Sequence, residues 1–338
     1  MAVQLKKLSD QVVIITGASS GIGLTTAKMA AERGARVVLA ARDEEGLRHA
    51  VEEISSEGGQ AVYVVADVAD MEAVHEIADT AVRSYGGFDT WVNNAGISIY
   101  GRTLEVPIED AQRLFDTNYW GTVNGCTVAV PHLRQRGGAL INVGSIVSDV
   151  AVPLQGHYSA SKHAVKGYTD ALRTELEEEG AAVSVTLVKP ASIDTPFPEH
   201  ARNYMEKEPV LPPPVYAPEE VARTILACAE KPMRDVVVGG GGRMMTAMGN
   251  LSPRARDKYM EAAMFDLQKT DQPSHLDRPD ALYSPMRGSG REHGGYPGHV
   301  MRSSVYTRAS LHPGVALVFV ALLGLTLSLG ARGGLRGR

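Results

Sequence analysis

Three features of the sequence predict an α/β fold with seven parallel strands in a doubly wound sheet. Short apolar runs rich in β-branched residues alternate with longer segments of helical spacing. The connections between them are short, as in parallel sheets whose strands are joined by crossover helices. A glycine-rich turn follows the first run and polar residues follow several others, at the sheet edge where such folds bind ligands.

Seven runs are predicted to be strands, because parallel strands buried on both faces are almost continuously apolar. They cover residues 11–15, 36–41, 61–66, 88–92, 139–143, 183–188 and 235–238. Helices are predicted at 24–33, 44–56, 71–85, 109–133, about 158–179 and 219–230. Gly34, Gly86 and Gly180 each follow a helix, as glycine commonly does, and Pro131 interrupts the fourth helix late.

The turn after the first strand has the sequence Thr16-Gly17-Ala18-Ser19-Ser20-Gly21-Ile22-Gly23. A strand, a glycine-rich turn and a helix in this order place backbone N–H groups and a helix N-terminus where a pyrophosphate can bind. The spacing is G-x-x-x-G-x-G, a variant of the G-x-G-x-x-G dinucleotide turn. A plain glycine-rich turn between strand and helix is the alternative.

The residues after the second strand bear on the choice of cofactor. A carboxylate there would bind the ribose 2′-OH of NAD, whereas an arginine would bind the 2′-phosphate of NADP. Ala40 and Ala41 end the strand and Arg42 follows, which favours NADP. Asp43 comes next and is interpreted as the N-cap of the helix over 44–56, although it leaves room for NAD.

Tyr158 and Lys162 stand four residues apart, which places them on one face of a helix. A free tyrosine has a pKa of about 10, too high for ready proton exchange at neutral pH. A neighbouring ammonium favours the phenolate and lowers that pKa, so the pair is a candidate general acid or base. A surface tyrosine beside a solvated lysine is the alternative interpretation.

Composition excludes several functional classes. The 338 residues are enough for one large α/β domain with extra segments, and the net charge of -5 gives no reason to expect nucleic-acid binding. Cys126 and Cys228 are far apart, so neither a disulfide nor a thiolate metal site is expected. The apolar run at 12–15 is too short for a signal peptide.

Over residues 8–240 the chain resembles the short-chain dehydrogenase/reductase family. The motifs that carry the resemblance stand in the family's order and spacing, and they are Thr16-Gly17 with Gly21-Ile22-Gly23, Asp67-Val68, Asn93-Asn94-Ala95-Gly96, Asn118, Ser145, and Tyr158 with Lys162. The resemblance implies a Rossmann-type fold, a small-molecule carbonyl or alcohol substrate, and a homo-oligomer, either a dimer or a tetramer.

The resemblance also implies roles for the matching residues. Tyr158 would donate or accept the proton, and Lys162 would lower its pKa and bind the nicotinamide ribose. Ser145 would hydrogen-bond the substrate oxygen, and Asn118 would support a proton relay through water. NADP(H) is the preferred cofactor and NAD(H) the alternative. The expected cofactor-binding residues are Gly17, Ser19, Ser20, Gly21, Ile22, Gly23, Arg42, Asp67, Val68, Asn94, Ala95, Gly96, Tyr158, Lys162, Pro190, Ile193 and Thr195.

One residue departs from the family pattern. Members usually carry Pro-Gly after the sixth strand, and this chain has Pro190-Ala191.

Three functions are compatible with the motifs. The first is an NADP(H)-dependent oxidoreductase that interconverts a carbonyl and a secondary alcohol. The second is a 3-oxoacyl-thioester reductase of lipid metabolism. The third is a non-catalytic NADP-sensing regulator, which would not require Ser145, Tyr158 and Lys162 together.

The chain is expected to have three parts. Residues 1–250 form the dinucleotide-binding domain, with an active-site loop or lid at 196–215. Residues 251–312 are rich in Pro, Gly, Ser, Arg and His toward their end, and a largely disordered linker is expected there, with a helix over 254–269. Residues 313–331 are a candidate transmembrane helix, because 314–331 carry no charge and roughly 17–25 apolar residues span a bilayer.

We predict that the full chain partitions with membranes and resists extraction by salt or alkali. An 18-residue helix is about 27 Å long, close to the roughly 30 Å thickness of the hydrocarbon core. Arg332, Arg336 and Arg338 follow the run, and arginines near a membrane span favour the cytoplasmic side. A cytosolic cofactor favours the same side for the enzyme domain. A single span cannot place both ends on one side, so the topology is left open. A full-length protein that stays monodisperse without detergent would contradict the anchor.

Overall fold

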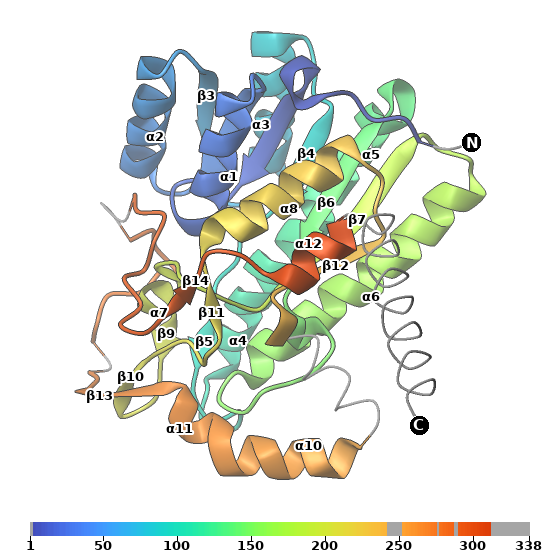
Figure 1. The fold of residues 1–338 in the computed structure, drawn as a ribbon. Coiled ribbons are helices and arrows are strands. Elements are labelled where there is room, and N and C mark those ends of the chain that lie inside the picture. The colour runs from blue at the N-terminus through green and yellow to red at the C-terminus, as the bar shows by residue number, and fades with distance from the viewer. Residues whose placement is uncertain (1–2, 242–251, 276, 287–289, 312–338) are drawn as a thin grey trace, which may run out of the picture.

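The computed structural model describes residues 3–241, 252–275, 277–286 and 290–311. Seven parallel strands form one sheet in the order β12-β7-β6-β4-β1-β2-β3 (Figure 1). Their bounds are β1 Val12–Thr16, β2 Arg36–Ala41, β3 Gln60–Val65, β4 Thr90–Asn93, β6 Gly138–Val143, β7 Val183–Pro190 and β12 Asp235–Val238. The predicted Rossmann-like fold with a seven-stranded parallel sheet is confirmed.

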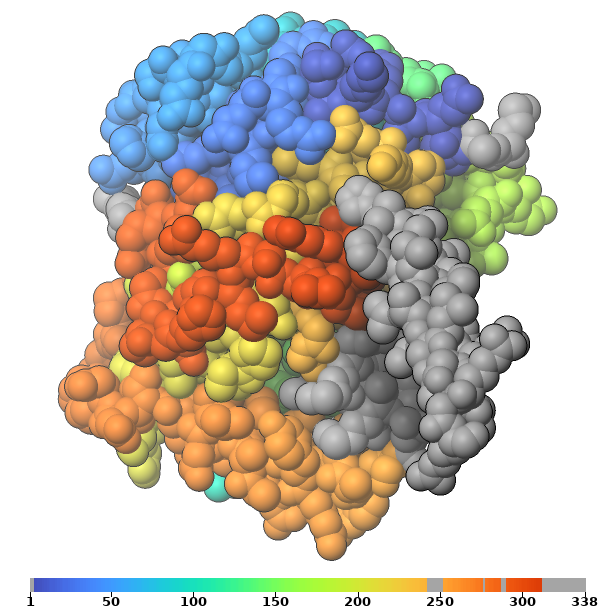
Figure 2. Space-filling model, in the orientation of Figure 1, coloured from blue at the N-terminus to red at the C-terminus, as the bar shows by residue number. Residues whose placement is uncertain are grey.

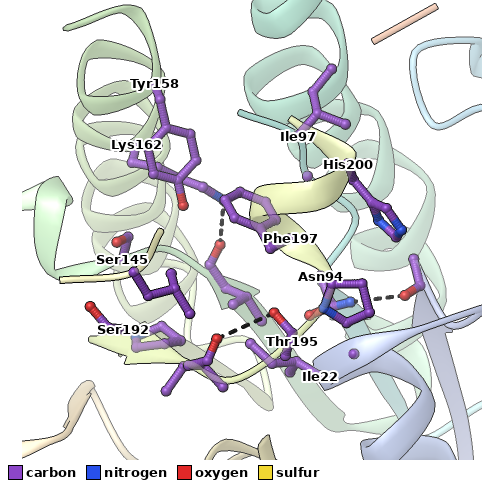
Figure 3. A pocket seen from close by; sticks show the side chains of 18 of the residues that line it. Ile22, Asn94, Ile97, Ser145, Tyr158, Lys162, Ser192, Thr195, Phe197 and His200 are labelled. Carbon is purple, nitrogen blue, oxygen red and sulfur yellow. Dashed lines mark hydrogen bonds between the residues drawn. The ribbon is translucent and has the colours of Figure 1, made fainter. Parts of the chain in front are cut away.

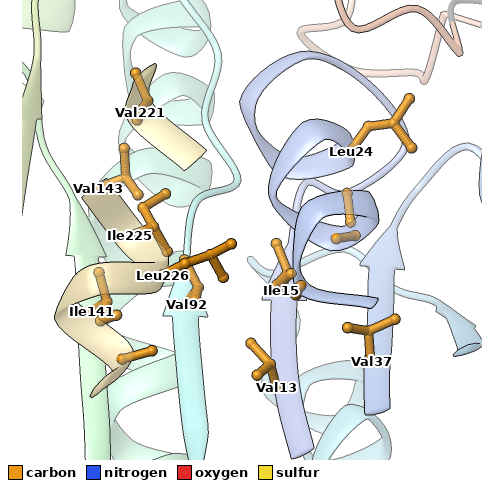
Figure 4. Close-up of a cluster of buried hydrophobic side chains, with 14 of the residues drawn as sticks. Val13, Ile15, Leu24, Val37, Val92, Ile141, Val143, Val221, Ile225 and Leu226 are labelled. Atoms are coloured by element: carbon orange, nitrogen blue, oxygen red, sulfur yellow. The ribbon is translucent and has the colours of Figure 1, made fainter. Parts of the chain in front are cut away.

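Helices cover both faces of this sheet because successive strand residues point to opposite sides. In β1, Val13 and Ile15 belong to one buried cluster, whereas Val12 and Ile14 belong to the other. The first cluster packs on α1 (Gly21–Glu32), α2 (Glu44–Ser56) and α8 (Pro218–Glu230). The second packs on α3 (Met71–Tyr85), α5 (Gly121–Arg136) and α6 (Gly156–Glu178). Figure 4 shows the first cluster, with side chains from the strands meeting α1 and α8.

Two helices differ in detail from their predicted extents. The helix α1 begins at Gly21 rather than at residue 24, so the last part of the glycine turn is its first turn. The segment predicted as one helix over 109–133 is α4 (Ile108–Phe115), the π-helical turn η2 (Asp116–Trp120) and α5 in succession. A single π turn within a helix often marks a functional position, and Asn118 lies in this one.

Short elements after β7 form the region expected to be a loop or lid. They are β8 (Ser192–Ile193), α7 (Phe197–His200), β9 (Arg202–Asn203), β10 (Lys207–Pro209) and β11 (Val215–Tyr216). Earlier short elements are η1 (Leu8–Asp10), β5 (Ile99–Tyr100) and η3 (Ile146–Ser148). The strand β9 pairs with β5, and β11 pairs with β8, so this region is attached to the carboxyl end of the main sheet.

The residues expected to form a disordered linker are largely structured where the model describes them. They form α10 (Pro253–Tyr259), η4 (Met260–Met264), α11 (Phe265–Leu267), β13 (Lys269–Pro273), β14 (Val300–Met301) and α12 (Val305–Leu311). Figure 2 shows these orange and red residues spread over one face of the domain. The Arg278 guanidinium donates hydrogen bonds to the carbonyls of Pro198, Glu199 and Ala201. Such contacts fix a polar segment that has no hydrophobic periodicity of its own.

The candidate transmembrane run at 314–331 lies outside the described residues. Among the residues that the model does describe, no helix is long and apolar enough to cross a bilayer.

Candidate active site

A cavity of about 510 Å³ runs along the carboxyl end of the parallel sheet. It extends from the glycine turn and the end of β2 to Tyr158 on α6, and it continues to α10 and η4. Figure 3 shows part of it, with Ile22 and Asn94 on one side and Tyr158 and Lys162 on the other. Of the expected site residues, these line it: Gly17, Ser19, Ser20, Gly21, Ile22, Arg42, Asp67, Val68, Asn94, Ala95, Gly96, Ser145, Tyr158, Lys162, Pro190, Ile193 and Thr195. Gly23 and Asn118 lie behind the cavity wall, where they support it.

The glycine turn requires glycine for two physical reasons. Gly17 and Gly21 have φ of +66° and +52°, a backbone conformation that favours glycine. A Cβ atom on Gly23 would lie 2.2 Å from the Gly17 carbonyl oxygen, so no side chain fits there. The Asn94 side-chain amide donates to the Thr16 carbonyl at 2.9 Å and ties the turn to the loop after β4. The N-terminus of α1 therefore faces the cavity, where it can bind an anion.

After the end of β2, Arg42 lies beside Asp67 in the cavity wall. The Arg42 Nη1 is 3.9 Å from Asp67 Oδ2, and Arg113 from α4 pairs with the same carboxylate. Burial alone would raise the pKa of Asp67, but the Ala69 amide and Arg113 outweigh it and lower that pKa. Asp67 therefore stays ionised and keeps both guanidinium groups at this end.

Asp43 was predicted as the N-cap of α2 and occupies that position. Its side chain, however, makes no capping hydrogen bond, and its buried Oδ2 has no partner among the described residues. Asp43 also lines the cavity next to Arg42. The carboxylate that left room for NAD therefore lies against the first turn of α2 without capping it, since a Cβ atom on Gly46 would be 2.7 Å from its Oδ2.

The tyrosine and lysine on α6 are both buried in the cavity wall. Lys162 Nζ lies 5.9 Å from the centre of the Tyr158 ring and donates a hydrogen bond to the Val143 carbonyl at 2.9 Å. Burial raises the pKa of Tyr158 to about 12, and a hydrogen bond with Ser145 acts in the opposite direction. Burial lowers the pKa of Lys162 to about 8. The expected lowering of the Tyr158 pKa by Lys162 is therefore not seen, because desolvation of the phenolate is the larger effect.

Ser145 and Asn118 are held in place by the backbone around them. Ser145 is the N-cap of η3 and accepts a hydrogen bond from the Val147 amide at 3.3 Å. The Asn118 side chain bonds both backbone groups of Ile97, accepting at 2.8 Å and donating at 2.9 Å. A Cβ atom on Gly96 would lie 3.3 Å from Asn118 Oδ1 and 3.6 Å from Lys162 Nζ. Asn118 and Lys162 therefore both lie close to Gly96, which lines the cavity.

The substitution of alanine for the family's glycine at residue 191 leaves the backbone unstrained. The only non-glycine residue with positive φ in the described part of the chain is Leu154. The Ala191 amide donates to the Val238 carbonyl at 2.9 Å, which continues the pairing of β7 with β12. Ile193 and Thr195 follow in the cavity wall, as the family pattern implies.

At the far end of the cavity, beyond Tyr158, sequence reasoning placed Phe197 and His200 only within the loop or lid expected over 196–215, and it identified none of the other residues there. The Phe197 ring packs against the Tyr158 ring with centres 5.6 Å apart. Val147, Val152, Met264 and other apolar side chains surround them. The polar side chains there are Gln155, Gln268 and His200. Gln155 donates to Gln268 at 2.7 Å, whereas the buried Nε2 of His200 has no partner among the described residues. No motif marks these positions, because they meet only in the folded chain.

The chain matches the family model described as short chain dehydrogenase over residues 11–206. It is 46% identical over 322 residues to a Bacillus subtilis protein named uncharacterized oxidoreductase YxnA, covering 94% of this chain and 90% of that one. In fold it resembles a short-chain dehydrogenase/reductase from Burkholderia phymatum in complex with NAD, with a TM-score of 0.67, 24% identity, and coverage of 80% of this chain and 100% of the other.

A second solved structure shows the same fold. It is an alcohol dehydrogenase from Thermococcus sibiricus complexed with 5-hydroxy-NADP. Its TM-score is 0.59 at 24% identity, and the match covers 67% of this chain and 95% of that one.

The pKa of Lys162 leads to a prediction about pH. Its ammonium is present below about pH 8 and is lost above it, whereas Tyr158 keeps its proton throughout this range. We expect kcat/KM to be flat from pH 6 and to fall as pH rises through about 8, because loss of the ammonium removes the positive charge beside the Tyr158 ring. Steady-state rates from pH 6 to 10 measure this.

Lys162→Met should lower the rate and remove the inflection near pH 8. Lys166→Met is the matched control, since Lys166 lies one turn later on α6 and pairs with Asp149. An inflection that persists in Lys162→Met would assign it to another group.

Proposed function

The chain belongs to the short-chain dehydrogenase family and is an NAD(P)-dependent dehydrogenase acting on CH–OH groups, and we propose that it uses NADP(H) to interconvert a carbonyl and a secondary alcohol with Tyr158 as the general acid or base. One observation carries the proposal. A single cavity joins the glycine turn and Arg42 at one end to Ser145, Tyr158 and Lys162 at the other. The cofactor and the reacting oxygen can therefore share one space.

The residues present fit a nicotinamide dinucleotide. The turn at Gly17 and Gly23 leaves no room for a Cβ atom, so its backbone can approach a pyrophosphate closely. The N-terminus of α1 adds N–H groups for the same phosphates. Arg42 would bind the 2′-phosphate of NADP, and Lys162 would bind the nicotinamide ribose. When bound, the cofactor supplies or accepts the hydride.

The side chains of this chain supply the proton and hold the oxygen. In the direction of reduction, Tyr158 donates its proton to the carbonyl oxygen as negative charge develops there. Ser145 donates a second hydrogen bond to the same oxygen. Its own position is fixed by the turn η3. The Lys162 ammonium then stabilises the resulting phenolate, and Asn118 supports the return of a proton through water.

The apolar far end of the cavity supports an apolar carbonyl substrate. Phe197, Val147 and Met264 would pack on it, while Gln155 and Gln268 offer polar groups. A 3-oxoacyl-thioester reductase would use the same catalytic residues and would differ in requiring an acyl carrier. A non-catalytic NADP sensor has no need of the buried Ser145, Tyr158 and Lys162. Attachment to a membrane through residues 314–331 is a proposal from the sequence alone.

Tyr158→Phe keeps the ring and removes the proton that is transferred. We expect turnover to fall by at least about 100-fold, the usual scale of general acid–base catalysis, with NADPH affinity little changed. Activity on a panel of apolar ketones, followed by NADPH absorbance, measures this. Tyr168→Phe on the same helix is the control and should retain activity. Near-normal turnover in Tyr158→Phe would remove this residue from the mechanism.

Arg42→Ala tests the choice of cofactor. We expect it to weaken NADPH binding by about ten- to a hundredfold, the scale of a hydrogen-bonded charge pair, and to leave NADH nearly unaffected. Titration of both cofactors measures the ratio. Arg48→Ala removes an exposed arginine of α2 whose ion-pair partner in the described part of the chain is Glu52, and it should change neither value. Equal losses for NADPH and NADH would show that Arg42 does not recognise the 2′-phosphate.

A further inference from the structure

Two described stretches near the C-terminus, residues 278–286 and 290–296, lie along the rim of the cofactor end of the cavity, and we call them the strap. We propose that the strap is part of the cofactor site. It closes over the adenosine and pyrophosphate half of a bound nicotinamide dinucleotide, which enters and leaves only when the strap lifts. This inference rests on the proposed NADP(H) dependence.

The first stretch is held by the arginine expected to recognise the 2′-phosphate. Arg42 Nη2 donates to the Ala281 carbonyl, and its Nη1 lies 3.4 Å from the carbonyl oxygens of Leu282 and Tyr283. Arg113 Nε also donates to the Leu282 carbonyl, at 3.1 Å. The strap is therefore fastened at the adenosine end by groups that the cofactor also uses.

The second stretch is fastened at the glycine turn. The Gly21 amide, at the N-terminus of α1, donates to the Arg291 carbonyl at 2.9 Å. The next residue, Glu292, forms an ion pair of 2.8 Å with Lys28 on α1. Both side chains are mostly buried, with 17% and 26% exposed, so water screens this pair less than a surface pair. The strap thus lies against the N-terminus of α1, beside the position expected for the pyrophosphate.

Its last residues rest on the segment after β7. The Tyr296 amide donates to Asp194 Oδ1 at 2.9 Å, and His293 lies 3.2 Å from the other oxygen of that carboxylate. Between these residues, Gly294 packs directly on the backbone of Thr195. A Cβ atom there would lie 2.3 Å from the Thr195 carbonyl oxygen. The strap therefore touches the domain at the end of β2, at α1 and after β7.

The strap encloses the cavity rather than filling it. Ala281, Pro285 and Met286 line the same space as Gly17 and Arg42, so room for a ligand remains beneath them. Figure 2 shows the C-terminal residues in orange and red lying against the blue N-terminal part of the domain. Hydrogen bonds and ion pairs to neighbouring segments hold the strap, among them the pairs of Asp280 with Arg202, Arg291 with Glu199 and Glu292 with Lys28. A segment held at the surface by such polar contacts can open without global unfolding.

A matched pair of glycine variants tests the proposal. Gly294→Ala places a methyl group against the Thr195 backbone and should push the strap away from the segment after β7. Gly290→Ala is the control, since its methyl group would meet nothing nearer than 3.9 Å and neither glycine has positive φ. We expect NADPH to leave Gly294→Ala at least about tenfold faster than it leaves the wild type, the scale of an overpacked contact, and to leave Gly290→Ala at the wild-type rate. A chase with excess NADP⁺, followed by the fluorescence of bound NADPH, measures the rate.

Glu292→Gln weakens the ion pair with Lys28 without touching Thr195, so it tests the strap even if Gly294→Ala disturbs its neighbour. We expect it to raise the same rate about two- to fivefold. In the wild type, NADPH should also protect the peptide bond after Arg291 from trypsin. Wild-type dissociation rates in both Gly294→Ala and Glu292→Gln would overturn the proposal. A wild-type protein that binds neither NADPH nor NADH would instead show that the proposed function itself is wrong.

Discussion

The structure depends on a close approach between two backbone turns, one after β1 and one after β4. The Gly23 position lies so near the Gly17 carbonyl that only hydrogen fits, and a Cβ atom on Gly17 would lie 2.8 Å from Ala95 Cα. The Asn94 amide joins the two turns through the Thr16 carbonyl. This contact sets the direction of α1 and opens the cavity between the strand ends. Any side chain at Gly17 or Gly23 would separate the two turns and displace the backbone groups that face the cavity.

Buried polar side chains hold the catalytic end of the cavity. Asn93 donates to Asn142 at 2.9 Å, and Asn142 donates to Thr169 on α6 at 2.9 Å, so β4, β6 and α6 are linked in the core. Lys162 donates to the carbonyl of Val143, the last residue of β6. Since buried polar groups are costly without partners, these bonds favour one arrangement of the strands and helix. Tyr158 and Lys162 are consequently presented at a fixed distance, in a low-dielectric wall that shifts both pKa values.

The part of the chain beyond the family match completes the site. The helix α10 supplies Tyr259 and the turn η4 supplies Met264 to one wall of the apolar end, and the strap borders the cofactor end. These segments have little hydrophobic periodicity and are held mainly by hydrogen bonds to backbone carbonyls, as at Arg278. Two regions of the chain therefore build the cavity. No sequence motif predicts that the region beyond the family match takes part.

The sequence by itself determined the parallel sheet and the motif residues at its carboxyl edge. Local patterns suffice for this, because buried strands need continuous apolar runs and the glycine turn needs residues without Cβ atoms. Three features were decided only by the tertiary structure. The pKa of Tyr158 follows from burial, which outweighs its neighbour on the helix. Asp43 occupies the cap position of α2 and lines the cavity, but its side chain makes no capping hydrogen bond. Residues 278–296 are ordered where described because distant arginines bind their carbonyls or pair with their carboxylates, which no local pattern can reveal.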